Sequence, residues 1–106
     1  MERLLALPNP PTAVFCYNDM SAVGALRALR GHGIKVPDDL SLVGFDDLAI
    51  ASYTSPLLTT VSQPKQQMGR MAMEIMIKLL SRIDSKTNIK VEGELIVRES
   101  TAPPKA

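Results

Sequence analysis

Two short apolar runs in this chain end in amide or acidic side chains, and a helical pattern lies between them. The first run covers residues 13–17 and leads directly into Asn18. The second covers residues 40–45 and leads directly into Asp46. A strand, a helix and a strand in this order predict two parallel neighbouring strands joined by a crossover. We therefore expect an α/β fold, with part of a Rossmann-like parallel sheet and flanking helices.

The ends of these two runs predict a ligand site. In an open parallel sheet, small molecules bind outside the carboxyl ends of the strands. Asn18 and Asp46 should therefore lie at one edge and offer hydrogen-bonding groups to a polar ligand. Each also has a structural alternative. Asn18 or Asp19 can cap the helix that runs to about Arg30, and Asp46 can cap segment 48–53, although that role suits Asp47 better.

Bulk properties exclude several classes of protein. A chain of 106 residues forms one domain or a piece of one, and its net charge is +1 with scattered Lys and Arg. It should therefore not bind nucleic acid by itself. No apolar run reaches the ~20 residues of a membrane span, and the first residues do not form a secretory signal. Cys16 is the single cysteine, which fits a reducing compartment, and we expect a cytoplasmic protein.

The sequence carries no catalytic or metal-binding pattern. His32 is the only histidine and lies in a glycine-flanked helix stop, where we expect it to be exposed. No second ligand of suitable spacing accompanies it for zinc. A nucleophile elbow and a phosphate-binding glycine loop are both missing from the sequence. We expect neither an enzyme nor a cofactor.

Two helical patterns have apolar faces that one small sheet does not explain. In the helix up to Arg30, one face should pack on the sheet (Ala22, Ala25, Leu26, Leu29). A second, mildly apolar face suggests either a partner or a partly exposed surface helix. The longest helix, about 65–82, has an apolar arc wider than the ~100° stripe of an ordinary surface helix. It should dimerise or pack against protein outside this chain.

Several ordered motifs together resemble the effector-binding region of LacI/GalR-type bacterial transcription regulators. These motifs cover nearly the whole chain: 12–19 (TAVFCYND), 24–29 (GALRAL), 36–47 (VPDDLSLVGFDD), 56–64 (PLLTTVSQP) and 97–101 (VREST). The resemblance implies the C-terminal part of a two-lobed, periplasmic-binding-protein-like fold. It covers the last third or so of such a regulator, without the DNA-binding helix-turn-helix.

The resemblance also implies a domain organisation. Residues 12–62 and about 88–100 would form the C-terminal lobe, and helix 63–84 would pack on an N-terminal lobe outside this chain. The whole regulator would bind a small effector, such as a sugar or nucleoside-like molecule, and would be a homodimer. Operator DNA would be bound only through the missing N-terminal domain, and no membrane would be involved. The alternative is a fragment of a periplasmic sugar-binding protein that serves transport.

Individual residues acquire expected roles from the same resemblance. Asn18, Asp46 and Gln63 match effector-contacting positions, although Gln63 could equally be a structural linker. Tyr17 stands where many relatives carry a smaller residue, and its ring would stack on an apolar sugar face or fill the cleft. A further group matches the family's two-fold dimer interface: Met20, Val23, Gly24, Arg27 and Tyr53.

Overall fold

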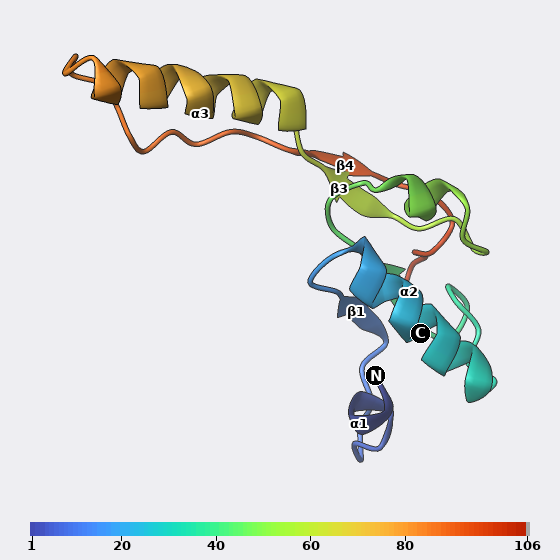
Figure 1. Ribbon diagram of the computed structural model, residues 1–106. Helices are drawn as coiled ribbons and strands as arrows, with labels where there is room; N and C mark the ends of the chain where they lie inside the picture. Colours follow the sequence, from blue (N-terminus) through green and yellow to red (C-terminus); the bar gives the residue numbers. More distant parts are fainter. Residues whose placement is uncertain (106) are drawn as a thin grey trace. The chain divides into compact units, whose positions relative to one another are not determined.

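The computed structural model describes residues 1–105, which divide into two compact units (Figure 1). The first unit comprises Met1–Ser62 together with the segment that begins at Leu95. The second unit comprises Gln63–Glu94. None of the helices in residues 1–105 is both long enough and apolar enough to cross a membrane.

The first unit follows the predicted strand, helix and strand order. Its elements are α1 (Glu2–Leu5), β1 (Ala13–Phe15), α2 (Asp19–Gly31), β2 (Ser41–Val43), the 3-10 helix η1 (Ala49–Ser52) and β3 (Thr60–Ser62). Strand β4 (Glu94–Ile96) starts where the second unit ends. The strands are shorter than the apolar runs in the sequence. The predicted elements at 13–17, 19–30, 40–45 and 48–53 are otherwise confirmed.

Strands β1 and β2 are parallel neighbours, as predicted. Ala13 pairs with Ser41 and Phe15 pairs with Val43. Hydrogen bonding continues past the strand ends, because the backbone N–H of Cys16 donates to the carbonyl of Val43 at 2.8 Å. The crossover through α2 makes this pairing parallel.

The chain after η1 extends the pairing beyond β2. Val43 forms a parallel bridge with Thr59. The N–H of Gly44 donates to the Thr59 carbonyl, and the N–H of Asp46 donates to the Val61 carbonyl, both at 2.9 Å. Strand β3 is also the hydrogen-bonded neighbour of β4. The carboxyl end of β2 is therefore held on both sides.

The core of the first unit lies between α2 and one face of these strands. The α2 residues predicted to pack on the sheet are all buried there, which confirms that face (Ala22, Ala25, Leu26, Leu29). They meet Leu42 and Leu58, which have no exposed surface. Each fully buried leucine contributes about 1.5–3 kcal/mol relative to an exposed one. Helix α2 ends at Gly31, and the following Gly33 adopts φ +71°, a conformation that glycine tolerates best.

The described residues of the first unit do not cover the opposite face of β1. Side chains alternate between the faces of a strand. Val14 and Cys16 therefore point toward α2, whereas Phe15 points away and is 65% exposed. Its ring meets Phe45 edge to face, with the ring centroids 6.2 Å apart. A doubly covered sheet needs more protein on this side.

The second unit contains α3 (Lys65–Leu80), which follows Pro64 as predicted. No residue of α3 is buried. Most of its large apolar side chains are exposed, together with Ile83 beyond its end (Met68, Met73, Met76, Ile77, Leu79, Leu80, Ile83). The helix ends two residues earlier than expected, and residues 89–91 form no regular element. The second unit, Gln63–Glu94, thus does not cover the wide apolar face of α3 by itself.

Gly44 generates the first testable prediction. A Cβ atom at this position would lie 2.9 Å from Leu58 Cδ2 and would overlap Asp19 Oδ1. Replacing Gly44 by Ala should therefore lower the free energy of unfolding by about 1–3 kcal/mol, as overpacking of a core does. Urea denaturation of the purified protein measures this. Gly31→Ala is the control, because nothing lies within 4 Å of its added methyl group. Equal stability of the two variants would contradict the prediction.

Candidate functional site

The carboxyl ends of β1 and β2 are joined directly by a backbone hydrogen bond. The N–H of Asp19 donates to the carbonyl of Phe45 at 2.9 Å. Asn18 precedes the donor and Asp46 follows the acceptor, so both residues lie at this edge of the sheet. We call this edge, formed by residues 17–19 and 45–48, the rim. A polar ligand at the rim could meet an amide and a carboxylate.

Asn18 caps α2, so the structural alternative for this residue is confirmed. Its Oδ1 accepts a hydrogen bond from the N–H of Ser21 at 2.8 Å. Capping by the side-chain oxygen satisfies one of the free amide donors of the first helical turn. It does not use the two N–H donors of the same side chain. Those donors remain the predicted contact to a ligand.

Asp46 and Asp47 both have backbones in the left-handed region, with φ 105° and 49°. Residues with a Cβ seldom adopt such angles, and the surrounding structure has to hold them there. The expectation that Asp47 caps segment 48–53 is wrong. Helix η1 begins after Leu48 without any side-chain cap. Asp47 instead forms an ion pair with Arg98, with Oδ1 and Nη2 2.7 Å apart.

The sequence reasoning considered Asp19 only as an alternative helix cap and missed its role in the core. Its carboxylate is fully buried. Oδ1 accepts a hydrogen bond from Thr60 Oγ1, and Oδ2 accepts one from the N–H of Leu48, both at 2.6 Å. Gly44 faces it and leaves room for Oδ1. Two signals in the sequence pointed to this role of Asp19. Asp19 is an acidic residue just after a strand end, and Gly44 lies shortly before the acidic pair at the end of the next strand.

Aromatic side chains flank the rim. Tyr17 is 88% exposed. Phe15, the last residue of β1, contacts Phe45. The sequence reasoning did not select Phe15, although it lies only two residues before Tyr17. Flat exposed rings suit the apolar face of a sugar or a base.

Gln63 and the rim belong to different units of the chain. Gln63 follows β3 directly in the sequence and is the first residue of the second unit. Its predicted contact to an effector therefore stays a prediction.

The residues expected at a dimer interface lie on α2 and, in the case of Tyr53, directly after η1. Val23, Arg27 and Tyr53 line one groove of about 460 Å³. Met20 and Gly24 are exposed on α2. The segment after η1 is fixed to α2, because Arg30 Nη2 donates to the carbonyl of Ser55 at 2.9 Å. The second face of α2 predicted from the sequence is thus continuous with Tyr53.

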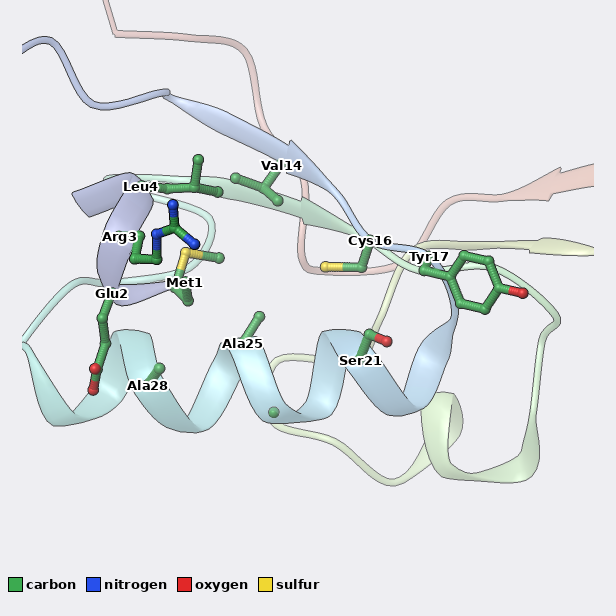
Figure 2. A pocket seen from close by; sticks show the side chains of 11 residues that line it. Met1, Glu2, Arg3, Leu4, Val14, Cys16, Tyr17, Ser21, Ala25 and Ala28 are labelled. Atoms are coloured by element: carbon green, nitrogen blue, oxygen red, sulfur yellow. The ribbon is translucent and has the colours of Figure 1, made fainter. Parts of the chain in front are cut away.

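A separate cavity of about 600 Å³ lies between α1, β1 and α2 (Figure 2). Val14, Cys16 and Ala25 line it on the core side, and Tyr17 stands at one end. Its lining does not include Asn18 or Asp46. Burial raises the pKa of the Cys16 thiol, which suits a core residue better than a nucleophile. Residues 1–105 contain no cluster of three or more side chains suited to hold a metal ion.

Residues 1–101 match the periplasmic binding protein-like domain. A probable HTH-type transcriptional repressor ExuR of Bacillus subtilis is 46% identical over 94% of this chain and 30% of its own length. A LacI family transcriptional regulator of Bifidobacterium animalis subsp. lactis superposes with a TM-score of 0.89 at 33% identity, over 98% of this chain and 38% of that one.

A LacI family regulator of Enterococcus faecium, solved with bound ribose, has a TM-score of 0.81 at 30% identity, over 98% of this chain and 38% of that one. The chain thus spans about 30% of the length of the curated relatives that it matches.

Asp19 generates the second prediction. Replacing it by Ala leaves the hydroxyl of Thr60 and the N–H of Leu48 without their acceptor, so the free energy of unfolding should fall by roughly 2–4 kcal/mol. Urea denaturation measures the change. Asp38→Ala removes an exposed carboxylate in the same unit and should leave stability nearly unchanged. An effect of Asp19→Ala no larger than that of Asp38→Ala would show that the buried network contributes little.

Proposed function

This chain belongs to the periplasmic binding protein-like domain family in the form carried by LacI-family transcription regulators, and we propose that it is the effector-binding and dimerisation part of a bacterial repressor. The proposed regulator acts in the cytoplasm. Its operator-binding helix-turn-helix lies outside this chain. The relatives are transcription regulators, so the transport alternative receives no support from them.

The proposed domain organisation assigns the two units to different lobes. Residues 12–62 and about 88–100 belong to the C-terminal lobe, and helix 63–84 packs on the N-terminal lobe. The division of the chain at Ser62 and Leu95 supports this assignment. So do the absence of any buried residue in α3 and the exposed Phe15 face of β1. Each surface has the apolar character of one that other protein covers.

The proposed effector is a sugar or a nucleoside-like molecule. The hydrogen bond between Asp19 and Phe45 carries this proposal, because it holds together the two strand ends that bear Asn18 and Asp46. The carboxylate of Asp46 would accept from hydroxyl groups and the amide of Asn18 would donate. Tyr17 and Phe15 would offer their rings, and Gln63 would contribute a further polar contact. Ribose bound to the Enterococcus faecium neighbour supports this class of ligand.

The proposed mechanism is a shift between two arrangements of the lobes. An effector changes the affinity of such a protein for DNA only by the difference in its own affinity for the two arrangements. Coupling of this kind is typically about 1–3 kcal/mol. The dimer matters because paired half-sites of an operator require paired DNA-binding domains.

The third prediction concerns the intact regulator and Asp46. Thermal unfolding with D-ribose, cellobiose and uridine should identify a compound that raises the melting temperature, since a ligand stabilises the state that it binds. Asp46→Ala should weaken binding of that compound about tenfold or more, through loss of charge-assisted hydrogen bonds. Calorimetric titration measures the affinity. Asp38→Ala is the matched control, and equal affinity of the two variants would remove Asp46 from the site.

The fourth prediction concerns the dimer. Arg27→Glu reverses the charge that each copy presents at the proposed interface, so the charge complementarity of Arg27 with the partner surface is lost, and the dimer dissociation constant should rise about tenfold or more. Sedimentation velocity of the intact regulator measures it. Lys90→Glu makes the same change of charge at an exposed position in the second unit, outside the proposed interface. Identical sedimentation of the two variants would exclude Arg27 from the interface.

A further inference from the structure

The conformation of the rim is held by its neighbours at three consecutive amides. The N–H of Asp46 donates to a carbonyl of β3. The N–H of Asp47 donates to Thr60 Oγ1 at 3.3 Å. The N–H of Leu48 donates to the buried Asp19. Two consecutive left-handed residues cost free energy, so these bonds determine where Asp46 lies.

Arg98 is the side chain that holds Asp47 itself. Its Nη2 lies 2.7 Å from Asp47 Oδ1, and its Nη1 donates to the carbonyl of Leu58 at 2.9 Å. Its backbone N–H donates to Thr59 Oγ1 at 3.0 Å. The guanidinium therefore bridges the rim and the adjacent strand segment. The two side chains are only 18% and 25% exposed, so water screens this pair less than a surface ion pair.

We propose that Arg98 is a positioning residue for effector binding. By holding Asp47, it fixes the backbone in which Asp46 presents its carboxylate at the rim. The claim that Arg98 supports effector binding rests on the proposed function. The claim that Arg98 holds the rim in place does not, because the rim can be measured without any ligand.

Two residues that bond to Asp47, Thr60 and Arg98, lie close to the points where the chain passes between the two units. Thr60 lies in β3, after which the chain enters the second unit, and Arg98 follows β4, by which the chain returns from it. The rim is therefore held by the two segments that connect the units. A change in the course of either segment acts on Asp47 and, through the backbone, on Asp46.

Hydrogen exchange of the intact regulator without ligand tests whether Arg98 holds the rim in place. Arg98→Met keeps much of the side-chain volume but loses both side-chain bonds. Exchange at the amides of residues 46–48 should accelerate about tenfold or more, the effect of losing a charge-assisted hydrogen bond. Exchange at the amides of residues 25–29 in α2 should stay unchanged. Arg98→Lys can keep one of the two side-chain hydrogen bonds, and Asp47→Asn keeps an acceptor for Arg98 without the charge, so both should give smaller accelerations.

The chain offers a matched control for this measurement. Lys105 and Asp39 form an ion pair of the same length, 2.7 Å, with side chains 69% and 42% exposed. Lys105→Met should leave exchange at residues 46–48 unchanged. Equal exchange at residues 46–48 in Arg98→Met and Lys105→Met would overturn the inference. A uniform acceleration that includes α2 in every Arg98 variant would also overturn it, since it would indicate general destabilisation.

Affinity for D-ribose, cellobiose and uridine tests whether Arg98 supports effector binding. With whichever of the three binds the wild type, Arg98→Met should weaken binding about tenfold or more. In an Asp46→Asn background the same change should have little further effect, because residues that act as a unit are not additive. A full additional loss would show that Arg98 does not act through Asp46. If the wild type binds none of them, the proposed function fails for these ligands, and the exchange data alone decide the role of Arg98.

Discussion

The buried carboxylate of Asp19 is the interaction on which the first unit depends. A charge without exposed surface is costly unless hydrogen bonds replace its water. Asp19 obtains them from Thr60 and from the N–H of Leu48, and its own N–H pairs with Phe45. One residue thus links the start of α2, the end of β2, strand β3 and the loop into η1. The space for it exists only because position 44 is glycine.

What could be predicted from the sequence was local or periodic. The apolar spacing in residues 22–29 identified the buried face of α2 correctly, and a short polar residue before a helix identified the cap at Asn18. The partners of Asp19 and Asp47 could not be found in this way, because Thr60 and Arg98 lie 41 and 51 residues further along the chain. Asp47 was therefore assigned a neighbouring helix end. Gln63 lies in the other unit, so its contact with an effector stays a prediction.

The two faces of the short sheet have different surroundings. The face toward α2 is closed by aliphatic residues and provides stability. The opposite face carries Phe15, which contacts Phe45 of the rim and is left exposed by the described residues of the first unit. A ligand site needs both properties, because polar groups can be held in place only by a rigid support. The same separation appears on α2, where one side is buried and the other bears the residues expected at a dimer interface.

The uncovered face of α3 has a chemical consequence of its own. Met68, Met73 and Met76 are all accessible on it. Accessible thioethers are oxidised to sulfoxides, which turns an apolar surface polar and prevents it from packing. Once other protein covers this helix, oxidants in solution would reach the three sulfur atoms far less easily. The sulfoxide content of these methionines would therefore show whether other protein covered the helix before it was exposed to an oxidant.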